Sequence, residues 1–503
     1  MDFPRASGVL LHPTSFPGRF GIGELGSEAY RFVDFLARAG QRLWQVMPLG
    51  PTGYGDSPYA SPSAFAGNPM LVSLERLQQE GLLEEDDVAT MPPLPEDRID
   101  FGAVIPVKMG LLRRAFERWR DGRASNEQRE QFQAFVEEHR FWLEDYALYM
   151  ALQETYSGQW NSWPDDLVVR RPEALEQARR ELADLIDFRC FLQYQFFRQW
   201  LDLKRYANER NILIIGDIPI FVAYDSADVW SNPGLFYLDE ERNPTVVAGV
   251  PPDYFSATGQ LWGNPLYRWD TMARDDYRWW AERFRQTFRL VDIVRIDHFR
   301  GFESYWEVPA GEETAINGRW LKGPGLAFFK AIERQLGALP IIAEDLGIIT
   351  EEVNVLRQAA GFPGMRVLQF AWVTDATNPY LPHNYVRDTV VYTGTHDNDT
   401  TIGWFQNISQ EEREKVLRYL GHGHIAIHWE LIRLAMMSVA NFAIFPLQDA
   451  LGLGSEARMN IPGQQIGNWG WRYRASMLTD ELAGALAEMA TTYGRVPAKQ
   501  DHA

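Results

Sequence analysis

The sequence contains a single cysteine, Cys190. One thiol forms no intrachain disulfide and supplies too few ligands for a cysteine-based zinc or iron–sulfur site. Long hydrophobic runs are missing as well, since none approaches the roughly 20 apolar residues that a membrane helix needs. Residues 1–8 lack the basic and then apolar regions of a secretion signal. We therefore expect a soluble protein of a reducing, cytoplasmic compartment.

Positive charge is also scarce. The chain has 49 Lys and Arg residues against 68 Asp and Glu residues, which gives a formal net charge of −19. A field of this sign repels phosphate-rich polymers and anionic lipid surfaces. We therefore expect neither a nucleic acid nor a membrane as a partner.

The sequence is long and rich in aromatic residues. It has 503 residues, of which 46% are hydrophobic and 13% aromatic, and it includes 18 Trp. This length exceeds what one simple core organises, so we expect either several domains or one large barrel with long insertions. Some of the aromatic residues are expected to line a binding site as flat apolar platforms.

Short apolar runs recur along the chain, and most are followed by polar or glycine-rich sequence and then a helical pattern. The runs lie at residues 8–12, 42–48, 212–217, 291–297, 339–344, 365–370, 389–393 and 441–448. Apolar strands that alternate with helices are typical of parallel strands buried on both faces. These runs predict an α/β protein, a single catalytic (β/α)8 TIM barrel spanning residues 1–503. An open doubly wound sheet is the alternative, because periodicity alone does not show closure.

The spacing between the runs predicts long insertions in the barrel. Residues 63–206 contain several amphipathic stretches and are interpreted as an inserted, helical subdomain. Residues 222–280 are interpreted as an inserted aromatic loop region, in which 250–256 and 260–265 have the composition of loops. Residues 452–473 are interpreted as a further loop on the active-site face of the barrel.

Carboxylic acids stand where several of the apolar runs end. Asp217, Asp297 and Glu344 end three of the runs, and Asp397 comes a few residues after another. In a parallel barrel the carboxyl ends of the strands converge on one mouth. The sequence therefore predicts a cluster of carboxylates that faces one substrate.

Two of these acids are expected to differ in protonation. Arg295 lies two residues before Asp297, on the same side of a strand, and would lower the pKa of that carboxyl. Partial burial and the neighbouring Asp345 would raise the pKa of Glu344. One ionised carboxylate and one protonated acid are what glycoside chemistry requires, with Asp397 as a third acid that binds sugar hydroxyls.

Each of these residues also has an ordinary structural interpretation. An aspartate at a strand end is often a helix cap or a loop hydrogen-bond acceptor. Arg295 equally suits a structural ion pair. His298 and His396 adjoin acids, and each suits either a sugar hydroxyl or a structural hydrogen bond.

Metal and nucleotide sites are weaker alternatives. His422, His424 and His428 resemble a zinc ligand set, but no carboxylate accompanies them. The GIGELG segment at 21–26 fits a phosphate-binding pattern, but no strand precedes it. We therefore expect no metal and no cofactor.

Several multi-residue motifs resemble a known family. The segments VRIDHFRG (294–301), AEDLG (343–347) and THDN (395–398) are similar to the three carboxylate regions of the α-amylase clan. A closer resemblance is to the amylomaltases, also called 4-α-glucanotransferases or disproportionating enzymes. It is carried by GYGDSPY (53–59), GVPPDYFS (249–256), QLWGNP (260–265) and RMNIPG (458–463).

The resemblance implies roles for individual residues. It implies Asp297 as nucleophile, Glu344 as acid/base and Asp397 as stabiliser of the transition state. Tyr59 would belong to a glucan-binding surface further from the reaction centre. The other implied sugar contacts are Asp217, Trp262, Arg295, His298, Phe370, His396 and Asn460.

Two features favour amylomaltases over ordinary amylases. The segment DIPIF at 217–221 lacks the Asn-His pair that amylases carry after the corresponding aspartate. The C-terminal segment 480–493 predicts one last helix, with no C-terminal β-domain of the kind that amylases have.

The resemblance implies an enzyme that transfers α-1,4-glucan segments to the 4-hydroxyl of another glucan, with retention of configuration. Its expected partners are α-1,4-glucans and maltooligosaccharides. An α-glucan hydrolase is the alternative within enzymes. A non-catalytic glucan-binding protein is the alternative from another class.

Overall fold

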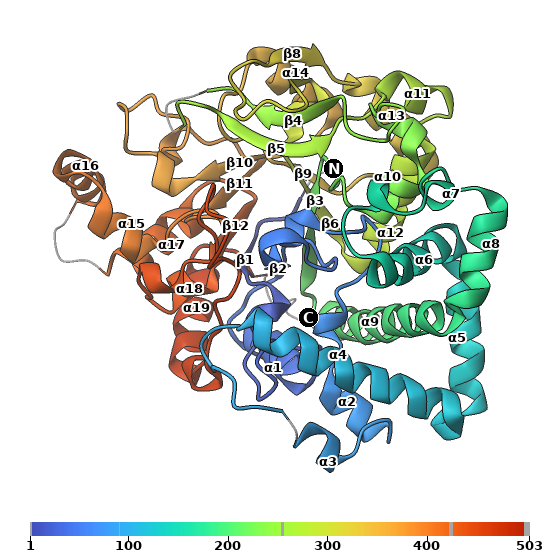
Figure 1. Ribbon diagram of the computed structural model, residues 1–503. Coiled ribbons are helices and arrows are strands. Elements are labelled where there is room, and N and C mark those ends of the chain that lie inside the picture. Colours follow the sequence, from blue (N-terminus) through green and yellow to red (C-terminus); the bar gives the residue numbers. More distant parts are fainter. Residues whose placement is uncertain (1–2, 90, 253–255, 422–425, 497–503) are drawn as a thin grey trace.

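A computed structural model describes residues 3–89, 91–252, 256–421 and 426–496. Eight parallel strands close into a barrel with the neighbour order β1-β12-β11-β10-β9-β6-β3-β2 (Figure 1). The strands are β1 (Ala6–Leu10), β2 (Leu43–Gln45), β3 (Leu213–Pro219), β6 (Ile293–Asp297), β9 (Ile341–Ala343), β10 (Gly364–Val367), β11 (Thr389–Tyr392) and β12 (Phe442–Pro446). Each overlaps one of the eight apolar runs. The (β/α)8 barrel is therefore confirmed, and the open sheet is excluded.

The strands are buried on both faces, as their near-continuous apolar sequence predicts. In β3, Ile215 packs among side chains inside the barrel, while the adjacent Ile214 packs among the surrounding helices. Ile342 and Ile341 of β9 divide in the same way. This alternation follows from the two-residue period of a strand.

A ring of helices covers the outside of the barrel. Its members are α1 (Ser27–Arg38), α9 (Ala183–Glu209), α12 (Arg278–Leu290), α13 (Gly325–Leu336), α14 (Glu351–Ala360), α15 (Thr401–Asn407), α17 (Ile427–Met437) and α19 (Asp480–Thr492). Local signals set several helix ends. Helix α14 ends at Gly361 in the left-handed conformation, and the Ser409–Glu412 capping box begins α16 (Gln410–Leu420).

The segment between β2 and β3 forms a helical lobe on one side of the barrel (Figure 1). Its helices are α2 (Leu74–Gln79), α3 (Glu85–Val88), α4 (Phe101–Arg118), α5 (Asn126–Glu138), α6 (Arg140–Tyr156), α7 (Asp165–Val168) and α8 (Pro172–Glu181). The last helix of the connection, α9, packs on both α6 in the lobe and β3 in the barrel. That residues 63–206 form a subdomain of their own stays a prediction.

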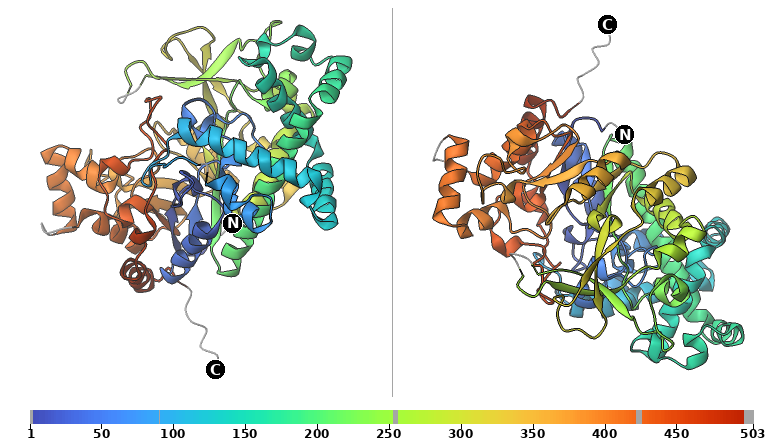
Figure 2. Two further views of the ribbon diagram at one scale, coloured as in Figure 1. Left: turned by 60° about the horizontal axis from the view of Figure 1, so that its bottom comes forward. Right: turned by 90° about the horizontal axis from the view of Figure 1, so that it is seen from above.

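A second sheet of four antiparallel strands, in the order β5-β4-β7-β8, lies next to this lobe (Figure 2). The strands are β4 (Val246–Val250), β5 (Gln260–Pro265), β7 (Ser304–Pro309) and β8 (Arg319–Lys322). The connection before β6 also contains α10 (Ala227–Ser231) and α11 (Trp269–Arg274).

The expectation that residues 260–265 form a loop is therefore wrong, because they form β5. A bulge between Val247 and Gly249 interrupts the pairing of β4 with β5, and Gly263 has φ +78°. Such glycines break the apolar alternation by which a strand is recognised in sequence. Residues 253–255 of the neighbouring segment lie outside the described residues.

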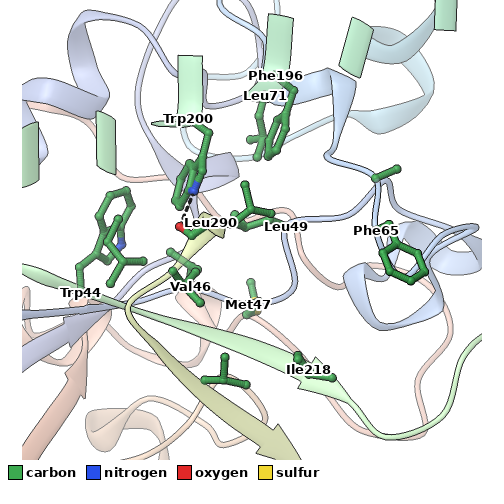
Figure 3. Close-up of a cluster of buried hydrophobic side chains, with 14 of the residues drawn as sticks. Trp44, Val46, Met47, Leu49, Phe65, Leu71, Phe196, Trp200, Ile218 and Leu290 are labelled. Atoms are coloured by element: carbon green, nitrogen blue, oxygen red, sulfur yellow. Dashed lines mark hydrogen bonds between the residues drawn. The ribbon is translucent and has the colours of Figure 1, made fainter. Parts of the chain in front are cut away.

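Large aromatic side chains fill the space between the barrel and helix α9 (Figure 3). Trp44 of β2 and Trp200 of α9 are fully buried, with ring centroids 5.7 Å apart. The indole Nε1 of Trp200 donates a hydrogen bond to the Leu290 carbonyl at 2.8 Å. Truncating such a side chain costs about 3–5 kcal/mol. This packing holds β2 against α9 and joins α9 to the end of α12.

After β12 the described residues form α18 (Leu447–Ala450), a long loop and α19, and they contain no C-terminal β-domain. Helix α19 packs on α1 and α17 and so completes the ring. None of the described helices has the length and apolar character required to cross a membrane.

Candidate active site

The carboxyl ends of the barrel strands open into a cavity of about 450 Å³. Asp297 and His298 reach it from the end of β6, and His396 and Asp397 from the loop after β11. Tyr59, Trp262 and Asn460 line it from the segment after β2, from β5 and from the loop after β12, in that order. The fold therefore brings together residues as distant in the sequence as Tyr59 and Asn460.

Arg295 forms ion pairs with two of the acids that end apolar runs of the sequence, Asp217 and Asp297. Its Nη1 lies 2.6 Å from Asp217 Oδ2, and its Nη2 lies 2.9 Å from Asp297 Oδ1. The side chains of Arg295 and Asp217 are almost completely buried, whereas that of Asp297 is 32% exposed. Burial opposes the positive charge, but Asp217 and Asp297 together raise the pKa of Arg295 well above its usual value. The predicted pairing of Arg295 with Asp297 along one side of the strand is present.

Glu344 follows β9 and is partly buried beside this group. Its Oε2 accepts a hydrogen bond from the His298 backbone N–H at 2.7 Å, and its Oε1 accepts one from the Leu346 backbone N–H at 2.8 Å. Burial and the charge of Asp297 raise the pKa of Glu344 to about 8, against the opposing effects of Arg295 and the two N–H groups. The raised pKa favours the protonated form of Glu344.

Asp345 does not make the expected contribution to the raised pKa of Glu344. Asp345 accepts a hydrogen bond from the Met365 backbone N–H at 2.6 Å and pairs with Arg357 and Arg366. Consecutive residues of an extended segment point to opposite sides, so Asp345 and Glu344 face different surroundings. The negative neighbour of Glu344 is Asp297.

His298 occupies a sharp turn directly after Asp297. Its φ of +51° is in the left-handed region, which side chains other than glycine rarely adopt. The imidazole meets the Trp262 ring edge-on at 4.8 Å, and burial lowers its pKa to about 4. The neutral ring has a buried Nε2 without a hydrogen-bond partner among the described residues.

Asp397 is held from the opposite wall. Its Oδ1 accepts a hydrogen bond from Asn460 Nδ2 at 2.6 Å and lies 3.3 Å from His396 Nε2. The side chain of Asp397 is 45% exposed. One face of this carboxylate is therefore fixed by protein contacts, and the other faces the cavity.

Tyr59 lies closer to the charged centre than the resemblance implies. Its hydroxyl donates to Asp217 Oδ2 at 2.8 Å, and its ring stacks on His396 with centroids 5.1 Å apart. The segment that follows β2 returns over the barrel mouth and places η3 (Pro58–Ala60) there. Tyr59 is therefore part of the same cavity as Asp297, and not of a remote surface.

Phe370 is the one expected sugar contact that lies among apolar side chains. It ends η9 (Leu368–Phe370), packs against the cluster inside the barrel and meets Tyr380 edge-on at 5.6 Å. It is absent from the described lining of the cavity. Its contact with sugar stays a prediction.

Sequence reasoning missed Trp469 and Arg458. The Trp469 ring lies 5.8 Å from Tyr59 and 5.9 Å from His396, so three rings form one platform at the cavity wall. Arg458 contacts the backbone of Asp397. Both residues lie in segment 452–473, which was expected at this face, and Arg458 begins the RMNIPG motif, but neither was predicted as a site residue.

Within the described ranges, no group of three His, Cys, Asp or Glu side chains is arranged to hold a metal ion. Of the histidines considered for zinc, His422 and His424 lie outside the described residues.

A comparison with protein families matches residues 11–479 to a family model described as 4-alpha-glucanotransferase. The chain is 53% identical to a 4-alpha-glucanotransferase of Synechocystis sp., over 98% of each chain. It is 52% identical to one of Thermus thermophilus, over 99% of this chain and 100% of the relative.

Solved structures agree with these matches. The amylomaltase of Streptococcus agalactiae, solved in complex with acarbose, superposes with a TM-score of 0.95 at 39% identity, over 98% of this chain and 100% of that one. The amylomaltase of Corynebacterium glutamicum superposes with a TM-score of 0.79 at 20% identity, over 98% of this chain and 75% of that one. The second likeness concerns the fold alone.

Proposed function

Because this chain belongs to the 4-alpha-glucanotransferase family, we propose that its barrel mouth transfers α-1,4-glucan segments through a covalent intermediate on Asp297. The chain is an enzyme of that family, a glucan transferase. We further propose which of its residues carries out each step of the transfer.

One observation carries the assignment. Asp297 lines the cavity and pairs with Arg295, whereas burial and the charge of Asp297 raise the pKa of the neighbouring Glu344 to about 8. A nucleophile must be ionised and a general acid protonated, so this pair matches the requirements of a retaining double displacement.

In the first step an Asp297 oxygen attacks the anomeric carbon of the donor glucan. The bond from that carbon to the glycosidic oxygen breaks, and the proton of Glu344 passes to the departing oxygen. In the second step the 4-hydroxyl of an acceptor glucan attacks the same carbon. Its proton passes to Glu344, and Asp297 leaves as a carboxylate. Two inversions give net retention.

Asp397 stabilises the positive charge that develops on the sugar ring. Asn460 donates to its Oδ1, which leaves the other carboxylate oxygen for the sugar hydroxyls. His298 lines the cavity, and His396 lies beside Asp397. These side chains supply the polar contacts that a sugar at the cleavage point requires.

The substrates are α-1,4-glucans and maltooligosaccharides. The platform of Tyr59, His396 and Trp469 and the edge-on Trp262 provide apolar faces of the kind that pack against sugar rings. The Streptococcus agalactiae relative is described in complex with acarbose, which supports a carbohydrate ligand for this site too. The single cysteine and the charge of −19 support a cytoplasmic setting, without nucleic acid as a partner.

Incubation with maltotriose tests the proposal. Transfer between two maltotriose molecules releases glucose and forms maltopentaose, and the number of reducing ends stays constant. A hydrolase would add one reducing end for every bond broken, and a binding protein would release no glucose. Either result would contradict the proposal.

A further inference from the structure

We propose that Arg458 is a positioning residue that holds the stabilising carboxylate Asp397 and its partner Asn460 in one fixed geometry. The inference rests on the proposed function, because it assumes that Asp397 acts on the sugar. Arg458 contacts the backbone carbonyls of Asp397 and Asn460 and not their side chains.

The guanidinium of Arg458 joins two loops. Its Nη2 donates to the Asp397 carbonyl at 2.6 Å, in the loop that follows β11. Its Nε donates to the Asn460 carbonyl at 2.7 Å, in the loop that follows β12. Within the part of the chain that the structure describes, no carboxylate pairs with Arg458. The Arg458 side chain therefore connects the two loops and is not part of an ion pair with a described carboxylate.

The two carbonyls belong to the residues that meet across the cavity wall, where Asn460 Nδ2 donates to Asp397 Oδ1 at 2.6 Å. A planar guanidinium fixes the relative position of the two carbonyls it binds, because its N–H groups form a rigid fork. The Arg458 guanidinium therefore holds the backbone of both residues whose side chains form the Asn460–Asp397 hydrogen bond. The oxygen of Asp397 that remains for the sugar is positioned as a result.

Other contacts keep the loops folded without this guanidinium. The Asn460 backbone N–H donates to the His396 carbonyl at 3.1 Å, and the Trp469 N–H donates to the Met459 carbonyl at 2.7 Å. The Gln448 side chain donates to the Ala457 carbonyl at 3.2 Å. Loss of Arg458 should therefore loosen the alignment of Asp397 and Asn460 without unfolding the loops.

The consequence for catalysis is specific. Asp397 is 45% exposed, and its side chain has few fixed contacts, so its direction depends on its backbone and on Asn460. A misplacement of about 1 Å at a reacting group lowers the rate about 10²-fold. The loss should appear in kcat more than in KM, because the contact with Asp397 strengthens in the transition state.

The first test compares Arg458→Met with a matched arginine. Arg5 also donates only to backbone carbonyls, those of Met436, Ser438, Ala440 and Tyr493, and is not part of the cavity lining. With maltotriose as substrate, kcat of Arg458→Met should fall about 10²-fold with a much smaller change in KM. Arg5→Met should keep the kcat of the unaltered enzyme. Unaltered kcat in Arg458→Met would overturn the proposal.

Two further measurements separate positioning from a merely structural role. Guanidinium ion added to Arg458→Ala should restore part of kcat, whereas added sodium ion should not. Arg458→Met combined with Asn460→Ala should cost less than the two single losses together, because both act through Asp397. Full additivity together with no rescue would overturn the proposal.

Two variants protect the test. If Arg458→Met does not fold, Arg458→Lys replaces it, because one ammonium lacks the fork that spans both carbonyls. Its kcat must still fall, and unaltered kcat would overturn the proposal. Asp297→Asn tests the proposed function by itself. Loss of turnover there with unaltered kcat in the Arg458 variants would refute the positioning role alone.

Discussion

The backbone N–H of His298 donates a hydrogen bond to Glu344 Oε2 at 2.7 Å. His298 is the residue after Asp297, so one peptide unit connects the expected nucleophile to the expected acid/base. The left-handed φ of His298, +51°, belongs to the turn that makes this donation. Strained backbone at such a position is typical of functional sites, where it holds reacting groups in place.

Asp297→Asn should abolish transfer. The amide preserves the shape of the side chain but removes the negative charge that attacks the anomeric carbon. We expect turnover to fall by at least about 10³-fold, measured as glucose released from maltotriose. Asp86→Asn on the exposed helix α3 is the matched control and should keep full turnover. If Asp297→Asn retains more than a few per cent of turnover, Asp297 is not the nucleophile.

The raised pKa of Glu344 should determine the alkaline side of the pH profile. Burial and Asp297 raise this pKa to about 8, so the acid is protonated below that pH and deprotonated above it. The first step consumes the proton, so kcat/KM should decline as the pH rises through about 8, with an apparent pKa that belongs to the coupled pair.

Glu344→Gln is the control for this profile. It should leave a small residual rate whose alkaline decline near pH 8 has disappeared, because the amide does not titrate. An unchanged alkaline limb in this variant would assign the titration to another group. The measurement is kcat/KM for maltotriose between pH 5 and pH 10.

Tyr59→Phe should weaken catalysis without removing the ring platform. The variant loses the hydroxyl that donates to Asp217 at 2.8 Å but keeps the ring that stacks on His396. A hydrogen bond to a charged group contributes about 1.5–3 kcal/mol, so kcat/KM should fall roughly 10- to 100-fold. Tyr156→Phe, an exposed tyrosine outside the cavity, is the control. Equal kcat/KM in both variants would show that the Tyr59 hydroxyl is dispensable.

Trp262→Ala should raise KM for maltooligosaccharides. Its indole is 38% exposed, meets His298 edge-on and lines the cavity. Loss of an apolar face of this size costs about 1.5–3 kcal/mol of binding, which corresponds to a roughly 10- to 100-fold higher KM. Trp320 on the same sheet is 37% exposed but is absent from the described cavity lining, so Trp320→Ala should leave KM unchanged. A similar rise in both variants would point to the sheet as a whole.

The architecture was predictable because its signals are local or periodic. The apolar runs marked all eight barrel strands, and the two-residue period placed Arg295 and Asp297 on one side of β6. The four-stranded sheet was missed because Gly249 and Gly263 interrupt the alternation of β4 and β5. A short strand with a bulge and glycines has little pattern of its own.

The site was predictable only in part, since its contacts join distant segments. The acids at strand ends were predicted as site residues because a parallel barrel sends all strand ends to one mouth. The hydrogen bond of Tyr59 to Asp217 spans 158 positions, and no local pattern announces it. The contacts of Arg458 and Trp469 with distant segments were not predicted for the same reason.

By itself the sequence determined the barrel, the family motifs and the identity of the acids, because periodicity, strand-end position and motif are properties of short segments. The tertiary structure decided whether the pKa of Glu344 is raised. This shift depends on burial and on the charge of Asp297, which reaches Glu344 only after β6 and β9 lie side by side in the closed barrel. Solvation and Coulomb energy depend on distances in space, which the order of residues does not contain.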